Sequence, residues 1–91
     1  MEREKIIKIL KGEVSKNHIK RAYIFGSFAR KRPRYNDIDL AIEPSKGFSL
    51  LDLSRMANVI EEKTGIHVDL VTLRSMHPEL KKIIEKEMVA I

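Results

Sequence analysis

The sequence contains no cysteine, only four glycines and three prolines, and no long apolar run. Without cysteine there is no disulfide, no thiolate metal site and no cysteine nucleophile, as expected of an intracellular protein. No signal peptide is evident and no segment approaches the roughly 20 apolar residues that cross a bilayer, so we expect a cytoplasmic protein without a membrane segment. A chain of 91 residues is expected to form one domain, residues 1–91, without a second domain for a large substrate. A large substrate would then have to be held by a partner protein or to bring its own binding surface.

Acidic side chains are absent between Ile19 and Asn36, a stretch that we call the basic window. It contains six bases, namely Lys20, Arg21, Arg30, Lys31, Arg32 and Arg34. Because the whole chain carries +5, the basic window carries +6 and the rest of the chain sums to −1. Such a run is typical either of a solvated surface or of a site that binds phosphate.

Apolar periodicity predicts alternating helices and strands without a linker or repeat. Helices are expected over Glu2–Lys16, from the cap Ser49 to Gly65, and from Pro78 onward; strands are expected over Arg21–Phe25, Asp37–Glu43 and Ile66–Thr72. The second helix would turn Leu50, Leu53, Met56, Ala57 and Ile60 toward the core, and the last would turn Leu80, Ile83, Ile84 and Met88 inward. The predicted fold class is therefore α/β or α+β, a small mixed three-stranded sheet packed against helices. The apolar end Met88–Ile91 could form a short edge strand, a partner-binding surface or a frayed terminus.

Three aspartates lie on the polar sides of two predicted strands. Strict alternation puts Asp37 and Asp39 on one face of their strand, together with Ala41, and puts Asp69 on the corresponding face of the last strand. If the apolar residues between them face the helices, the three carboxylates converge on the open face. Such a cluster is costly unless cations neutralise it, and its oxygen ligands suit two Mg²⁺ ions, or Mn²⁺. The alternative is the solvated face of an edge strand.

A Gly-Ser pair follows the first predicted strand. Gly26 allows a ligand to approach the backbone closely, and a helical turn beginning at Ser27 would offer free N–H groups and a hydroxyl to phosphate. Arg30 could then neutralise the phosphates through forked hydrogen bonds. His67 shares a face with Asp69 and is a candidate substrate contact, and Tyr35 could stack on a base or simply pack.

These motifs resemble a known family. Gly26-Ser27, nine intervening residues, Asp37-Ile38-Asp39-Leu40 and a third aspartate in the segment HVDLV at 67–71 are similar to the nucleotidyltransferase superfamily that includes DNA polymerase beta. The short length and the sequence GSFAR at 26–30 resemble its smallest branch, the minimal nucleotidyltransferases found beside HEPN-domain proteins in prokaryotic toxin-antitoxin pairs. The resemblance implies the polymerase beta-like nucleotidyltransferase fold.

The resemblance also implies roles for individual residues. Gly26 and Ser27 would bind the nucleotide phosphates, Asp37 and Asp39 would ligate both metal ions, and Asp69 would ligate the catalytic ion and help to activate the acceptor hydroxyl. In the antitoxin branch the reaction transfers AMP from ATP to a tyrosine of the partner HEPN ribonuclease, which silences this toxin. Two residues depart from the pattern, because Lys31 stands where glycine is common and Asn36 stands where serine is usual, and the loop is about one residue short.

Three hypotheses follow from the sequence. The first is an Mg²⁺-dependent adenylyltransferase that acts on a cognate HEPN toxin. The second is an antitoxin of the same fold that neutralises its partner by binding alone. The third, and the less favoured, is a nucleic-acid-binding module that grips phosphates with the basic window; such a module would show steep salt dependence and would tolerate loss of Asp39.

Overall fold

The structure, a computed structural model, describes residues 2–30 and 37–91, except for the side chain of Ser27. Along the chain the elements are α1 (Arg3–Lys16), β1 (Arg21–Phe25), α2 (Gly26–Ala29), β2 (Asp37–Glu43), α3 (Leu50–Thr64), β3 (His67–Thr72), the 3₁₀ turn η1 (Leu73–Ser75), α4 (Pro78–Glu85) and β4 (Val89–Ala90). The helices and strands expected from the sequence are all present. Lys31, Arg32, Arg34, Tyr35 and Asn36, to which the sequence gave possible roles, lie outside the described residues.

The four strands form one mixed sheet in the order β3-β2-β1-β4. β1 pairs antiparallel with both β2 and β4, whereas β2 and β3 are parallel and are joined through α3. The mixed α/β class is thus confirmed, with a fourth short strand that the predicted three-stranded sheet did not include. Of the three alternatives for the apolar C-terminus, the edge strand is the one observed.

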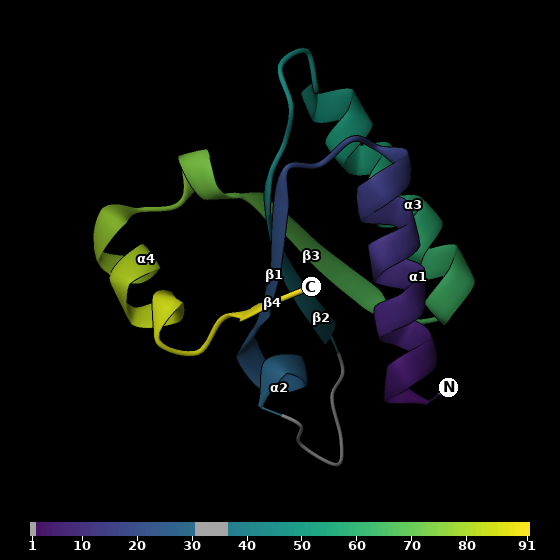
Figure 1. Cartoon of the computed structure of the whole chain (residues 1–91), viewed down its shortest axis with the longest axis horizontal. Helices are drawn as coiled ribbons and strands as arrows, with labels where there is room; N and C mark the ends of the chain where they lie inside the picture. The colour runs from purple at the N-terminus through teal and green to yellow at the C-terminus, as the bar shows by residue number, and fades with distance from the viewer. Residues whose placement is uncertain (1, 31–36) are drawn as a thin grey trace.

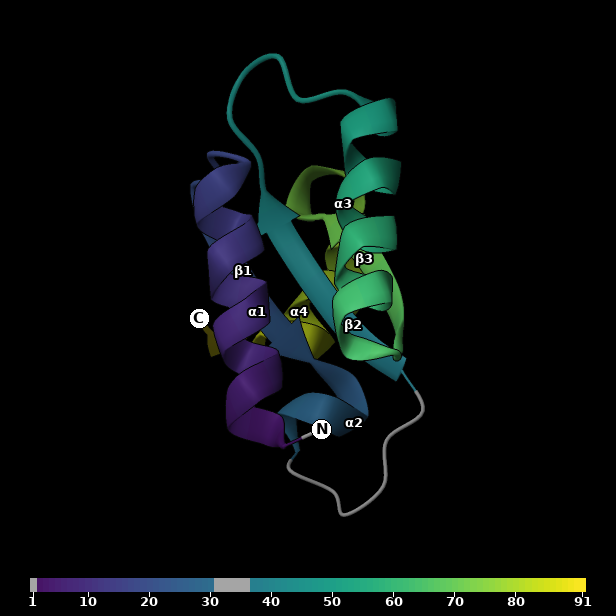
Figure 2. The ribbon, with the colours of Figure 1, turned by 90° about the vertical axis from the view of Figure 1, so that its right-hand side faces the viewer.

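Helices α1 and α3 lie together on one face of the sheet, and α4 lies on the other side (Figures 1 and 2). The core between the sheet and these two helices consists of fully buried apolar side chains from five elements: Ile6, Leu10, Ile24, Phe28, Ile38, Leu40, Ile42, Met56 and Ile60. The alternation of β2 is therefore resolved as expected, with its isoleucines and leucine facing the helices. Because these residues are fixed in the core, Asp37 and Asp39 must point to the opposite face.

Helix α3 begins and ends at the capping residues expected from the sequence, Ser49 and Gly65. The Ser49 hydroxyl accepts a hydrogen bond from the Asp52 backbone N–H, and the Asp52 carboxylate accepts one from the Ser49 N–H, which forms a capping box. Gly65 ends the helix in the left-handed conformation with φ +72°. α3 is held to α1 by an ion pair of 2.9 Å between the Lys63 ammonium and the buried Glu13 carboxylate.

Three side-chain placements predicted from periodicity are wrong. Leu50 is 83% exposed at the first residue of α3. Leu80 and Ile83 of α4 are 50% and 64% exposed, because α4 stands apart from the sheet core and buries none of its residues. Ala41 is fully buried although it shares the face of Asp39, so that face is covered over part of its length.

None of the described helices combines the length and apolar character that a bilayer crossing requires.

Candidate active site

Asp39 and Asp69 lie opposite each other on the neighbouring parallel strands β2 and β3, as register partners. Asp37 precedes Asp39 by two residues and therefore lies on the same face of β2, opposite His67. Asp39 is half-buried, whereas the Asp69 side chain is 55% exposed. The structure thus brings the predicted aspartates to one region on the face away from α1 and α3.

The electrostatics of this region centre on Asp39. Burial raises the pKa of its carboxyl above the usual value, the negative charges of Asp69 and Asp37 raise it further, and a side-chain hydrogen bond with Asp69 acts in the same direction. The positive charge of His67 opposes these effects only in part. An additional cation near Asp39 and Asp69 would favour the ionised carboxylates, so the pair fits a site for a positively charged ligand.

The aspartates fit Mg²⁺ in one particular way. Among the described residues, no three acidic or histidine side chains are arranged as a complete set of metal ligands. Mg²⁺, however, is usually held by one or two carboxylates, with water and substrate phosphates completing the octahedron, rather than by a cage made only of protein. Two crowded carboxylates with a raised pKa at Asp39 match that kind of site. The predicted convergence is therefore closest for Asp39 and Asp69, with Asp37 acting on Asp39 through its charge.

Gly26 lies against Asp39. The glycine opens α2 directly after β1, its φ is +71°, and a Cβ built on it would lie 2.2 Å from Asp39 Oδ2. Both the left-handed conformation and the contact require glycine at this position. Arg3 of α1 stabilises this turn. It donates a hydrogen bond to the Phe28 carbonyl, and its guanidinium lies 4.3 Å from the centre of the Phe28 ring.

His67 connects two carboxylates. Its Nδ1 lies 2.6 Å from Glu61 Oε1 and its Nε2 lies 3.2 Å from Asp69 Oδ1. Desolvation lowers the pKa of the imidazole, but the hydrogen bond to Asp69 and the charges of Glu61 and Asp69 outweigh it, so the pKa is raised overall. His67 therefore orients the Asp69 carboxylate. The sequence indicated its shared face with Asp69, but not its pairing with Glu61 from α3.

Arg30 does not point its charge at the aspartates. Its Nη2 donates to both carboxylate oxygens of Glu87, at 2.9 and 2.7 Å, in a partly exposed ion pair. The pair ties the end of α2 to the segment between α4 and β4. The nucleotide-binding role that the sequence suggested for Arg30 thus stays a prediction.

The described part of the basic window does not form one patch. Lys20 and Arg21 lie at the start of β1, and Arg30 lies beyond its end, so the strand separates them. This arrangement disfavours a continuous basic track along this part of the chain.

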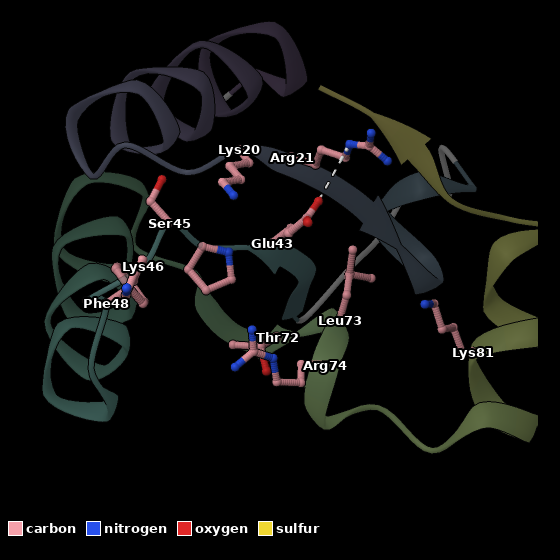
Figure 3. A pocket seen from close by; sticks show the side chains of 12 residues that line it. Lys20, Arg21, Glu43, Ser45, Lys46, Phe48, Thr72, Leu73, Arg74 and Lys81 are labelled. Carbon is pink, nitrogen blue, oxygen red and sulfur yellow. Dashed lines mark ion pairs between the residues drawn. The ribbon is translucent and has the colours of Figure 1, made fainter.

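Two cavities are lined in part by residues of α4. The smaller, about 420 Å³, is lined by Asp39 and Asp69 and by apolar side chains that include Met76, Leu80 and Ile84. The larger, about 890 Å³, lies at the carboxyl ends of β2 and β3 and contains none of the predicted site residues (Figure 3). Chemistry at the aspartates therefore belongs to the smaller cavity, which combines carboxylates with an apolar wall.

The chain is similar in sequence to known proteins. A family model described as a nucleotidyltransferase domain matches residues 3–91. A relative from Methanocaldococcus jannaschii, provisionally named protein adenylyltransferase MJ0435, is 44% identical over 90 residues, which cover 98% of this chain and 92% of the relative.

Solved structures are similar over most of the chain as well. One that is provisionally described as a minimal nucleotidyltransferase has a TM-score of 0.81 at 29% identity and covers 98% of this chain and 91% of its own. A chain of a toxin-antitoxin structure with AMP-PNP has a TM-score of 0.73 at 26% identity, with coverages of 99% and 72%. A chain from the complex of the tri-AMPylated Shewanella oneidensis HEPN toxin with MNT antitoxin has a TM-score of 0.67 at 27% identity, with coverages of 97% and 66%.

Proposed function

The chain belongs to the nucleotidyltransferase domain family, and from this premise we propose that it is a protein adenylyltransferase that transfers AMP from ATP to a tyrosine hydroxyl of a HEPN-type toxin, and so acts as an antitoxin. The observation that carries the proposal is the pairing of Asp39 with Asp69 on parallel strands, at a cavity and against Gly26. Family membership bears out the resemblance seen in the motifs.

The phosphates of ATP would lie at the turn of Gly26 and Ser27. Gly26 carries no side chain where the backbone comes closest to Asp39, and the Asp39 carboxylate fills that space, so a phosphate bound to the backbone of this turn would lie beside the carboxylate proposed to hold the metal ions. Arg30, two residues beyond Phe28, would add a forked donor if it exchanged Glu87 for the nucleotide. ATP is proposed as the nucleotide because a similar toxin-antitoxin structure contains AMP-PNP.

Asp37, Asp39 and Asp69 would hold two Mg²⁺ ions, or Mn²⁺, together with the phosphates. When bound, these ions would stabilise the negative charge that builds up on the attacking and leaving oxygens. The carboxylates that the chain supplies fit this use, because burial and mutual repulsion raise the pKa of Asp39 and a bound cation would relieve both.

In the proposed reaction, the tyrosine oxygen forms a bond to the α-phosphorus of ATP. The bond between that phosphorus and the bridging oxygen breaks, and pyrophosphate leaves with the electron pair. Asp69, the more exposed carboxylate, would accept the proton of the tyrosine hydroxyl. His67 holds the Asp69 carboxylate in place at 3.2 Å and acts as a positioning residue.

The acceptor would be a protein that covers α4. Leu80 lines the cavity of the aspartates and is 50% exposed, and Ile83 on the same helix is 64% exposed. Apolar side chains beside a catalytic cavity are typical of a surface that a partner buries. A HEPN toxin is the proposed partner because similar structures are complexes with such toxins. We place the reaction in the cytoplasm and assign it to a single domain, residues 1–91.

The test uses ATP labelled on the α-phosphate, Mg²⁺, the purified protein and its co-encoded neighbour. We expect label on the neighbour with the wild type and with Asp52→Asn, a control in the capping box far from the site, and no label with Asp37→Ala or Asp39→Ala. Equal binding of the neighbour by all four proteins without any transfer of label would replace the enzyme by an antitoxin that acts through contact alone.

A further inference from the structure

The larger cavity (Figure 3) is lined by residues at the start of β1, whereas α2 follows the end of that strand, so the cavity lies at the opposite end of the strand from α2. Its walls come from the start of β1, the end of β2 with the loop that follows it, the end of β3 with η1, and α4. With a volume of about 890 Å³, it is large enough for a small-molecule ligand. The adenylyl-transfer chemistry proposed above makes no use of it.

Cations dominate the lining of this cavity. Five of the side chains are basic, namely Lys20, Arg21, Lys46, Arg74 and Lys81, and Glu43 is the one acidic residue among those that line it. With five positive charges and one negative charge, the lining carries a formal charge of +4, nearly the net charge of the entire chain, which is +5. Four separate segments contribute these charges, so their gathering follows from the fold and not from one basic run in the sequence.

Most of these cations are not neutralised within the protein. Arg21 forms an ion pair of 3.5 Å with Glu43, its cross-strand neighbour. Lys20, Lys46, Arg74 and Lys81 form no ion pair with any part of the chain that the structure describes. Figure 3 shows Lys20, Arg74 and Lys81 on three sides of the hollow. Like charges that surround one space repel each other, and an anion placed between them would remove that repulsion.

The cavity also has an apolar part. Pro44, Phe48 and Leu73 line it and are half-buried, and Phe48 packs against the hydrophobic core. These side chains exclude water from part of the wall, and charge interactions strengthen where water is excluded. The loop that carries Lys46 and Phe48 is anchored by the Ser45 hydroxyl, which donates to the His18 carbonyl.

We propose that this cavity is a second anion site, which binds a small linear polyphosphate through Lys20, Lys46, Arg74 and Lys81. Phosphate matches the donors, since the arginine offers a planar fork and the lysines offer mobile point charges. A small anion matches the geometry, because the cations surround one hollow, whereas a nucleic-acid backbone needs a track of charges. The site is independent of the proposed adenylyl transfer. If polyphosphate does not bind in this cavity, the proposed adenylyl transfer is unaffected.

The experiment is a titration of ¹⁵N-labelled protein with inorganic tripolyphosphate, in the presence of EDTA so that no divalent ion is present. We expect saturable amide shifts in residues 45–48 and 72–74, with little change in residues 26–29. Arg74→Gln and Lys46→Gln should each raise the Kd about fivefold, since each loses roughly one charge-assisted hydrogen bond. Lys82→Gln is the matched control, because Lys82 is an exposed α4 lysine that does not line the cavity. It should change the Kd less than twofold.

Several results would overturn the proposal. An equal loss of affinity in Lys82→Gln would mean that the protein attracts tripolyphosphate only through its net charge. Shifts confined to residues 26–29 would place the anion at the aspartate site instead. Tighter binding of a single-stranded oligonucleotide, with shifts beyond the cavity, would assign the cations to nucleic acid. Equal affinity for hexaglutamate would remove the preference for phosphate.

Discussion

Gly26 and Asp39 are placed so close together that a single added carbon on Gly26 would lie 2.2 Å from the Asp39 Oδ2 atom. Gly26 therefore does more than permit a turn, because its missing side chain leaves the space that the Asp39 carboxylate occupies. The backbone at Gly26, with φ +71°, and the position of Asp39 on β2 depend on each other.

This contact predicts the effect of Gly26→Ala. The substitution should lower adenylyl transfer at least about 100-fold, because the displaced Asp39 carboxylate no longer matches its ligands. It should also cost about 1–2 kcal/mol of stability through left-handed strain. Gly65→Ala is the matched control, since Gly65 has φ +72° and no atom within 4 Å of an added Cβ. It should lose similar stability and keep the activity; equal activities of the two variants would contradict the role given to Gly26. Labelled-ATP assays and urea denaturation measure both quantities.

Much of this site could be predicted because strand alternation is a local property. The isoleucines and leucine of β2 fix Asp37 and Asp39 on one face, and the pattern of β3 does the same for Asp69. What alternation does not contain is the register between strands. The pairing of Asp39 with Asp69 arises from the parallel crossover through α3, and a shift of one residue would have separated them.

Other features depend on contacts between distant segments. Arg30 and Glu87 are 57 residues apart in sequence, and nothing near either residue indicates that they pair. The prediction that Leu80 and Ile83 of α4 face the core was wrong for a different reason. Periodicity showed that Leu80 and Ile83 share the apolar side of a helix, but it does not show whether that side meets this chain, a partner or solvent.

The repulsion at Asp39 predicts a conflict between stability and function. Asp39→Asn should make the protein without metal more stable at neutral pH, because it removes a charge that burial, Asp69 and Asp37 all disfavour. The same variant should lose transfer activity and the rise in Tm that Mg²⁺ with ATP gives the wild type. Calorimetry with and without Mg²⁺ and ATP measures this. Glu62→Gln, an exposed acid of α3, serves as control and should stay within about 0.5 kcal/mol. A less stable Asp39→Asn would show that the charge is already compensated.

Substituting each partner of the Arg30–Glu87 ion pair in turn distinguishes a structural role of Arg30 from a nucleotide-binding role. Because both side chains are partly exposed, the pair with Glu87 should contribute less than about 1 kcal/mol, so Arg30→Gln and Glu87→Gln should differ little in stability. If Arg30 contacts ATP, Arg30→Gln should raise the apparent KM for ATP about fivefold, while Glu87→Gln leaves it unchanged or lowers it. Steady-state transfer at varied ATP distinguishes these outcomes. An identical rise in KM for both variants would mean that Arg30 serves only to hold Glu87.

The capping box of α3 predicts how stability depends on acid. Hydrogen bonds from the Ser49 backbone and side chain lower the pKa of Asp52, so the folded protein keeps this carboxylate ionised at a pH where the unfolded chain is already protonated. The contribution of Asp52 is therefore complete above its ordinary value of about 3.9 and is lost as the pH falls through the lower folded value. Ser49→Ala should cost about 1 kcal/mol at neutral pH, because it removes the N-cap. Asp52→Asn should also be less stable there, and the difference from the wild type should shrink toward pH 3. Urea denaturation from pH 3 to pH 7 measures this. A difference that stays constant across the range would mean that the charge of Asp52 adds nothing to the cap.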